Sequence, residues 1–428
     1  MSLSRSKESM PKIQSGILAQ RAGEETNLPA RQRSGRVWLI VFQASMTVGI
    51  IALCILLLKI INDSFGLMIF EFQKDPAALT VSGTPPEALP KEELEIILKD
   101  NISQGRYSTL EKEKSITSRG KQELYDLIVT EVLKPKVIKT YPLLQSIVAR
   151  EEIYQFAINN YPGAFITFRA WVNWNFIASP QSSDPLTAGI SNAIMGSLFS
   201  ILIAMLFAVP VGIGAAIYLE EYSRDNWINR LIRTNINNLA GVPSVIYGIL
   251  GLAIFVRLME PVTSGSIFGI AAPGTANGRT LLSAGLTLGL LVLPLVIINA
   301  QEAIRSVPQS LREASFGVGG TRWQTLWYHV LPNAIPGTLT GTILAMSRAI
   351  GETAPLILIG ASTFITYNPN SAFSKFTSVP VQVYQWTARP QDVWRNLAAA
   401  AILVLLGMLL SLNAVAILLR NRYSRRVI

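Results

Sequence analysis

The sequence predicts an all-α, polytopic membrane protein with six membrane-spanning helices and a helical insert between the first and second of them. Half of the 428 residues are hydrophobic and only 15% are charged, whereas soluble domains carry about 25% charged residues. The mean hydropathy is +0.37. Runs of roughly 20 apolar residues match the thickness of a bilayer core. Six such runs occur, at 37–58, 192–219, 239–256, 281–300, 338–359 and 397–419.

The distribution of Lys and Arg predicts how these spans are oriented, because short cytoplasmic segments are enriched in both residues. Residues 1–36 hold seven of them, the last nine residues hold four, and the segments 220–238 and 301–337 hold three each. Residues 257–280 and 360–396 hold only five between them. Both termini are therefore expected in the cytoplasm. This sorting also accounts for the net charge of +10, so that no nucleic-acid partner is expected.

The first apolar run is expected to remain as a membrane anchor. A signal peptide has an apolar stretch of about 7–15 residues followed by small residues at a cleavage site. The run 37–58 is longer, and it continues into KIINDSFG, which contains no such site. The single cysteine, Cys54, lies within this run. We therefore expect it to serve packing and expect no disulfide framework.

Residues 59–187 have an ordinary polar composition and are expected to form a small helical domain outside the cytoplasm. In KQELYDLIVTEVL, Leu124, Leu127, Ile128 and Val132 recur at the spacing of one helix face. The segment YPLLQSIVAREEIYQFAI repeats this pattern with Leu144, Ile147 and Val148. The aromatic residues of YPGAFITFRAWVNWNF, including Trp171 and Trp174, suit either a membrane interface or the core of the domain itself.

These features divide the chain into consecutive segments. They are a cytoplasmic tail (1–36), a first span (37–58), the extracytoplasmic insert (59–187), a core with spans two to six (188–420) that includes a cytoplasmic loop (301–337), and a second cytoplasmic tail (421–428). A further cytoplasmic loop, EEYSRDNWINRLIRTNINN, places Trp227, Ile228, Leu231 and Ile232 on one face and arginines on another. This pattern predicts either a helix on the inner membrane surface or a solvated loop.

The loop 301–337 predicts two short helices joined at a glycine corner. Ser310 and Glu313 have the spacing of a capping box, which satisfies free N–H groups at a helix start. Gly319 and Gly320 are expected to stop this helix. Thr321 and Gln324 form a second capping box, which predicts a helix from Arg322 to Pro332. Such a protruding element suits binding by another protein, although an ordinary structured loop would have the same caps.

The segment REASFGVGGTRWQTLWYHVLP resembles the EAA loop of ABC importer permeases. The family pattern is E-A-A, three residues, G, nine residues and then I-x-L-P, and this chain matches it at Glu313, Ala314, Gly319, Leu331 and Pro332. Ser315 replaces the second alanine of the pattern and His329 replaces its isoleucine. We expect the histidine to be packed or interfacial. The resemblance implies that this loop docks onto ATPase subunits, and that the fold is the MetI-like permease bundle.

Two further stretches, NNLAGVPSVIYGILGLAIFV and SRAIGETAPLILIG, resemble the PstA-type permease subunits of phosphate ABC importers. The resemblance covers about residues 170 to 425 and leaves the insert unexplained. It implies a bacterial cytoplasmic (inner) membrane location and transport of inorganic phosphate. It also implies four partners: a homologous PstC-type permease chain, two PstB-type ATPase subunits and a PstS-type extracytoplasmic phosphate-binding protein. Membrane lipid surrounds the bundle.

An arginine and a glutamate, Arg348 and Glu352, interrupt the fifth apolar run. A charge in mid-membrane costs about 2.5–3.5 kcal/mol on insertion scales, so both residues are expected to serve a function or to form a structural ion pair. Four residues apart on a helix, they can pair. Because a guanidinium fork matches phosphate oxygens, we expect Arg348 to attract the anion and Glu352 to position Arg348. Pro355 predicts a kink at Gly351, which frees Thr353 to join this substrate pathway.

The chain lacks the pattern G-x-x-x-x-G-K-[ST], since its only Gly-Lys pair is followed by Gln122. It is therefore expected to be a transport subunit without its own ATPase site, with no catalytic, cofactor-binding or metal-binding residues. Three alternatives stay open: a permease for another oxyanion such as sulfate or molybdate, a secondary transporter or channel that needs no ATPase, and a membrane scaffold that senses phosphate.

Overall fold

The structure is a computed structural model that describes residues 12–424 except 80–85, 271–276 and 362–363. The outermost parts of both predicted tails, residues 1–11 and 425–428, therefore lie outside the described residues. The chain forms two compact units, Met1–Lys59 and Ile60–Ile428. Helix α1 (Lys12–Ser64) accounts for the described part of the first unit and enters the second at its end.

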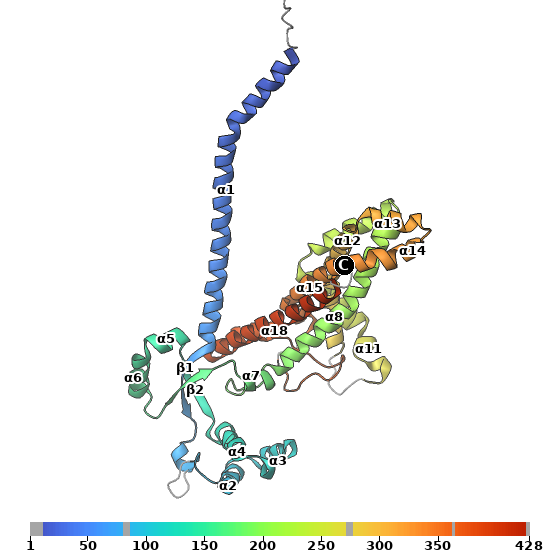
Figure 1. Cartoon of the computed structure of the whole chain (residues 1–428). Helices are drawn as coiled ribbons and strands as arrows, with labels where there is room; N and C mark the ends of the chain where they lie inside the picture. The colour runs from blue at the N-terminus through green and yellow to red at the C-terminus, as the bar shows by residue number, and fades with distance from the viewer. Residues whose placement is uncertain (1–11, 80–85, 271–276, 362–363, 425–428) are drawn as a thin grey trace, which may run out of the picture. The chain divides into compact units, whose positions relative to one another are not determined.

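The elements of the second unit are mostly helical (Figure 1). The described helices are α2 (Lys91–Asn101), α3 (Gln104–Glu113), α4 (Lys121–Ile128), α5 (Leu143–Val148), α6 (Arg150–Asn160), α7 (Trp174–Ala178), α8 (Ser191–Ile217), α9 (Trp227–Ala240), α10 (Ser244–Gly251), α11 (Glu260–Thr263), α12 (Leu281–Arg305), α13 (Gln309–Gly317), α14 (Arg322–Thr325), α15 (Leu331–Gly351), α16 (Ala354–Ile359), α17 (Val379–Thr387) and α18 (Asp392–Ser424). Short 3₁₀ turns lie at η1 (Pro76–Leu79), η2 (Ile116–Ser118) and η6 (Ser266–Phe268), and π-helical turns lie at η3 (Val129–Leu133), η4 (Tyr218–Tyr222), η5 (Leu252–Leu258) and η7 (Leu326–Val330).

Four of the six predicted spans are single helices long and apolar enough to cross a membrane, at Arg31–Ser64, Ser191–Tyr222, Leu281–Arg305 and Asp392–Arg422. The third predicted span, 239–256, corresponds mainly to the α10–η5 helix, which meets the preceding helix α9 at a bend of 106°. Among the described residues, this bent pair raises the number of spans to five at most by length and composition. The fifth predicted span is broken between α15 and α16, which corrects the prediction of one continuous helix there.

Helix α9 has the amphipathic character that the sequence predicts. Asn226 caps its start by accepting a hydrogen bond from the Asn229 backbone N–H at 2.8 Å. Trp227 and Leu231 are exposed, as are Ile228 and Ile232. A helix that leaves its apolar face unburied in the chain itself is suited to a membrane surface.

The membrane core is built on close packing of α8 against α12. Gly285 and Gly289 lie four residues apart on α12 and face α8. A Cβ added to Gly285 would lie 2.5 Å from the Cβ of Ile203, and one added to Gly289 would lie 2.7 Å from Phe207. Small residues at this spacing allow two helix backbones to approach closely, which is how helices associate where no hydrophobic driving force acts between them.

We expect Gly285→Val to destabilise this helix pair by about 1–3 kcal/mol, because the added methyl groups overpack the contact with Ile203. The melting temperature of the purified protein in detergent would report the loss. Gly214→Val on α8 is the matched control, since a Cβ at Gly214 meets no atom within 4 Å. Equal melting temperatures for both variants would contradict the close-packing interpretation.

The insert contains a three-stranded antiparallel sheet, so the prediction of a purely helical insert, and with it the all-α class, was wrong there. Strand β1 (Phe65–Phe72) lies between β2 (Pro135–Thr140) and β3 (Phe165–Ala170). Met68 pairs with Thr140 on one side and with Thr167 on the other. A strand covered on both faces is a continuous apolar run with no alternation, and Leu67, Met68 and Ile69 of FGLMIFEF are all buried.

The two apolar patterns that predicted helices in the insert both lie on helices, but only the first pattern is buried. Leu124, Ile128 and Val132 are buried together, as their spacing predicts. Leu144, Ile147 and Val148 also belong to one helix, α5, but their side chains are exposed. Trp171, near β3, packs in a core, as one of the two alternatives predicts, and Trp174 is exposed.

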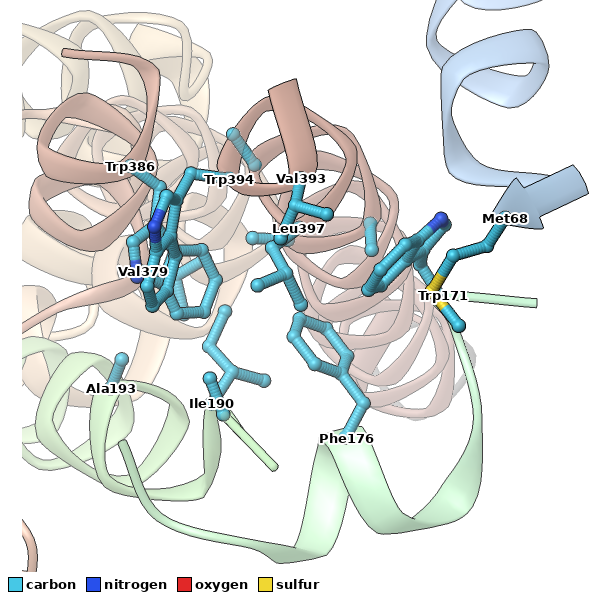
Figure 2. Packing of buried hydrophobic residues seen from close by; sticks show 14 residues of the cluster. Met68, Trp171, Phe176, Ile190, Ala193, Val379, Trp386, Val393, Trp394 and Leu397 are labelled. Atoms are coloured by element: carbon cyan, nitrogen blue, oxygen red, sulfur yellow. The ribbon is translucent and has the colours of Figure 1, made fainter. Parts of the chain in front are cut away.

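One apolar cluster joins the insert to the membrane helices (Figure 2). Met68 of β1 and Trp171, which follows β3, meet Phe176 of α7 and Leu397 of α18, while Trp386 of α17 lies farther along the same cluster. Polar contacts follow the same line, since the Thr140 hydroxyl donates to the Asn396 Oδ1 at 2.8 Å. Because side chains from both regions share one core, residues 60–428 form a single unit.

Candidate translocation and coupling sites

Arg348 and Glu352 form an ion pair where helix α15 ends. The Arg348 Nε lies 3.6 Å from the Glu352 Oε1. Helix α15 stops at Gly351, and Glu352 has extended backbone angles (φ −74°, ψ 126°). Thr353 then occupies the position directly before α16. The expected opening at Gly351 is therefore confirmed, but Glu352 lies beyond the helix rather than on the same helical face as Arg348.

The surroundings of the pair leave room on one side. The Arg348 side chain is 40% exposed and that of Glu352 is 17% exposed. A Cβ added to Gly351 would meet no atom within 4 Å, so open space adjoins the break. This exposed arginine in an apolar helix is accessible to a ligand or a second chain.

Neighbouring helices hold the break from the other side. The Ser347 hydroxyl donates to the Asn413 Oδ1 of α18 at 2.7 Å, which fixes α15 one residue before Arg348. Helix α16 packs on α10, where a Cβ on Gly248 would lie 2.7 Å from the Pro355 Cα. The Ser347–Asn413 hydrogen bond thus holds the end of α15, and Gly248 allows α16 to approach α10 closely.

The glycine corner of the loop 301–337 forms as predicted, although one of its two caps does not. Thr321 and Gln324 make the expected capping box, and Gly319 takes a left-handed conformation with φ +87°, which favours glycine. Helix α13 begins at Gln309 after Pro308, without a side-chain cap. The predicted Ser310–Glu313 box was therefore wrong: Pro308 starts the helix earlier, and Ser310 lies inside its first turn.

The second helix of the corner does not end at Pro332, which corrects the predicted boundary. Helix α14 passes through the π-helical turn η7 directly into α15. Pro332 lies in the first turn of α15, where its missing N–H is tolerated after a π-helical turn. Helix α14 of the corner and Arg348 therefore lie on one uninterrupted helical segment, Arg322–Gly351, and Glu352 directly follows it.

The predicted coupling residues divide between surface and interior. Glu313, Ala314 and Gly319 are exposed, whereas Leu331 and Pro332 are half-buried, with Leu331 packed against the cluster around Ile304. Ser315, the departure from the family pattern, is buried, and its hydroxyl lies 2.8 Å from that of Thr325. The serine thus ties α13 to α14. His329 is exposed and not packed within this chain.

The outer face of the corner is apolar and uncovered in this chain. Trp323 and Trp327 stack with ring centroids 5.6 Å apart. Both are more than half exposed, and the nearby apolar residues Phe316, Val318 and Tyr328 are exposed as well. We call these five residues the corner surface. Contiguous exposed aromatic residues mark a protein interaction site.

Sequence reasoning missed a charge cluster that anchors the corner to the membrane helices. The Glu220 carboxylate accepts hydrogen bonds from Arg233, Gln301 and Arg305, all at 2.9–3.3 Å. The adjacent Glu221 pairs with Arg312 of α13, with 2.8 Å between Arg312 Nη2 and Glu221 Oε1. Two acidic residues directly after a long apolar run were the available signal.

We expect Arg312→Ala to destabilise the protein by about 2–3 kcal/mol, because it leaves the Glu221 carboxylate unpaired in a largely buried setting. The Arg312 and Glu221 side chains are 12% and 19% exposed, and Arg312 also donates to the Val307 and Ile304 carbonyls. Thermal unfolding would measure this loss. Arg305→Ala is the control, since the Arg305 side chain is 64% exposed and surface pairs contribute about 0–1 kcal/mol. The interpretation fails if Arg305→Ala is the more destabilising change.

A cavity of about 1180 Å³ lies between the insert and the start of α18, away from these sites. Lys134, Lys136 and Lys139 line it, together with Gln181 and Asp392. Asn413, which contacts the helix of Arg348, lies some 20 residues further along α18, or about 30 Å at the helical rise. The cavity and the Arg348 pair are therefore separate places in the chain.

These features define a class: a multi-pass membrane transport subunit. It combines membrane-spanning helices, a charged pair at a helix break, and a protruding helical corner with an interaction surface. The chain belongs to the family of binding-protein-dependent transport system inner membrane components. The sequence model of this family matches residues 208–428.

The chain is similar to several named transport proteins. The chain is 31% identical over 239 residues to the "Probable ABC transporter permease protein YqgI" of Bacillus subtilis (strain 168), covering 54% of this chain and 76% of that one. It is 33% identical over 238 residues to the phosphate transport system permease protein PstA of Yersinia pestis, covering 55% and 74%. It is 34% identical over 195 residues to the phosphate transport system permease protein PstC of Pasteurella multocida (strain Pm70), covering 44% and 60%. A solved structure of the MetNI methionine ABC transporter in inward-facing conformations is 18% identical, with a TM-score of 0.40, and covers 58% of this chain and all of that one.

Proposed function

We propose that this chain is the permease subunit of an ATP-driven importer that carries inorganic phosphate across the cytoplasmic membrane. The relatives named as phosphate transport permeases support the substrate, and the family supports the transport class. The observation that carries the proposal is the Arg348–Glu352 pair at the end of α15. A guanidinium presents paired donors that match the oxygens of phosphate.

The proposed topology places both termini in the cytoplasm and the insert 59–187 outside the cell membrane. It has six membrane-crossing segments, with the α10–η5 helix and the broken α15–α16 pair as two of them, and α9 on the inner membrane surface. Broken helices are tolerated at membrane depth where they adjoin protein or a polar cavity. The uneven distribution of Lys and Arg supports this orientation.

The proposed pathway runs past the break between α15 and α16. The exposed edge of Arg348 and the open space beside Gly351 suit a passage shared with a second permease chain. Arg348 attracts the anion, and Thr353 offers a hydroxyl next to it. Glu352 holds Arg348 and weakens its grip on phosphate, because conduction requires a site that the ion can leave.

The proposed coupling uses the uninterrupted helix from the corner to the pair. ATPase subunits bind the corner surface, and their closure on ATP displaces α13 and α14. Because η7 joins α14 to α15 without a break, this displacement reaches Arg348 along a single helix. The importer would comprise a PstC-type permease chain, two PstB-type ATPase subunits and a PstS-type phosphate-binding protein on the outer side.

Uptake of radiolabelled phosphate tests the proposal. Cells without their own phosphate importers would express this chain with its partner subunits, and excess unlabelled phosphate or excess sulfate or molybdate would compete separately. ATP-dependent uptake that only phosphate blocks is the expected result. Uptake blocked by sulfate or molybdate would assign another oxyanion. Uptake that persists without the ATPase subunits would identify a secondary transporter or channel.

A further inference from the structure

Helix α5 of the insert is amphipathic in the direction opposite to that of a helix in water. Its apolar residues Leu144, Ile147 and Val148 are 67%, 67% and 78% exposed. Its polar Ser146 is buried, and the Ser146 hydroxyl accepts from the Leu67 N–H at 2.8 Å and lies 2.9 Å from the Pro142 carbonyl oxygen. The serine thus faces the sheet, and the apolar residues form an outward face, here called the α5 face.

Other helices of the insert are oriented in the usual way. Leu124 and Ile128 of α4 are fully buried, and Ile153 and Ala157 of α6 are buried against the sheet. The insert therefore buries apolar side chains from its other helices, whereas α5 has no buried apolar residue. Adjacent exposed apolar side chains indicate a surface that is covered by something other than water.

Hydrogen bonds tether the segment around α5 to the ends of two long apolar helices, α18 and α1. Helix α18 begins with the exposed charged pair Arg395–Asp392 and becomes apolar from Leu397 onward, so we take Asn396 as the residue nearest the membrane surface. The Asn396 Oδ1 accepts from the Thr140 hydroxyl at 2.8 Å. Helix α5 begins three residues after Thr140, which in an extended chain is at most about 10 Å away.

The second tether comes from the end of the first span. The Leu144 backbone N–H donates to the Asn62 Oδ1 at 2.7 Å. The next residue, Asp63, accepts through its carbonyl oxygen from the Asn396 amide at 2.6 Å. Helix α5 is thus tethered near the start of helix α18 and lies beside strand β1 (Figure 1).

We propose that α5 is an interfacial anchor whose Leu144, Ile147 and Val148 insert into the lipid of the membrane leaflet on the side of the insert. The tethers to Asn62 and, through Thr140, to Asn396 select lipid as the occupant, because each asparagine lies at the polar end of a helix long and apolar enough to cross a membrane. Interfacial helices bury their apolar faces at the boundary between headgroups and acyl chains. The anchor fixes the insert to the membrane surface and does not depend on which substrate is carried.

Quenching by brominated lipids tests this anchor directly. The full-length chain would carry Val148→Cys with a fluorescent probe, in a Cys54→Ala background that removes the only native cysteine. It would be reconstituted with its partner subunits in phosphatidylcholine nanodiscs, with or without bromine near the carbonyl ends of the acyl chains. We expect blue-shifted emission and about twofold stronger quenching by the brominated lipid, as for a side chain at the acyl boundary.

Two further positions make the result specific. Ile96→Cys on α2 is the matched control, since Ile96 is an apolar residue of the insert that is 59% exposed and lies outside α5. Gln145→Cys lies on the flank of α5 and should be quenched less than Val148→Cys. Equal quenching at Val148 and Ile96 would overturn the proposal and leave α5 in water. A blue shift without quenching would overturn it in favour of a protein partner on the α5 face.

Discussion

Replacing Arg348 by alanine is expected to lower phosphate uptake by roughly 10- to 100-fold, because hydrogen bonds to charged groups are worth about 1.5–3 kcal/mol. The loss should occur at normal membrane levels of the protein, since the Arg348 side chain is 40% exposed and its removal leaves no cavity in a packed core. The initial rate of uptake, normalised to the amount of protein in the membrane, measures the effect.

The conservative variant Arg348→Lys distinguishes the substrate pathway from a structural pair. The substituted lysine would keep the charge and could still pair with Glu352, but a single ammonium group cannot make the two parallel bonds of a guanidinium. Arg348→Lys should therefore transport nearly as poorly as Arg348→Ala. The control is Arg395→Ala, which removes an arginine from an exposed pair with Asp392 on α18. Wild-type uptake by either Arg348 variant would return the pair to a structural role.

Trp323→Glu is expected to weaken binding of the ATPase subunits by about 30-fold or more, because a tryptophan at the centre of an interface contributes about 2 kcal/mol or more. Trp323 is 59% exposed and stacks on Trp327, so the change removes the middle of the corner surface and adds a charge. Co-purification of the ATPase subunits with this chain, and the affinity in detergent, would measure the loss.

A variant of equal exposure controls for the added charge. Ile96 is also 59% exposed, but it lies on α2 of the insert, so Ile96→Glu should leave ATPase binding unchanged. Unaltered ATPase binding by Trp323→Glu would show that the ATPase subunits bind another part of the loop. In that case Glu313 and Ala314, which are exposed on α13, would be the next residues to test.

The insert shows where reasoning from periodicity failed. Strand β1 places three apolar residues side by side in the sequence, Leu67, Met68 and Ile69, and all three are buried. A short apolar run that is covered on both faces lacks the alternation that identifies a strand. The helix α5 had the opposite problem. Its spacing predicted a helix correctly, but spacing cannot tell whether an apolar face is turned toward a core or toward lipid.

The candidate sites were predictable to the extent that they depend on local sequence. The Thr321–Gln324 box and the left-handed Gly319 are local, and both formed as expected. The pairing of Arg348 with Glu352 is also local. The Ser310–Glu313 box failed because Pro308, two residues earlier, offers a competing helix start. The end at Pro332 failed because a π-helical turn accommodates the proline.

The sequence by itself determined the features that arise from composition and from near neighbours along the chain. These are the apolar helices, the glycine corner and the charges within the fifth apolar run. Only the tertiary structure decided which distant residues come together: Glu221 pairs with Arg312, Asn396 bonds to Asp63 and Thr140, and Met68 and Leu397 share one apolar core. The physical reason is that helix and turn formation depend on residues within a few positions, whereas burial and ion pairing depend on how the elements pack.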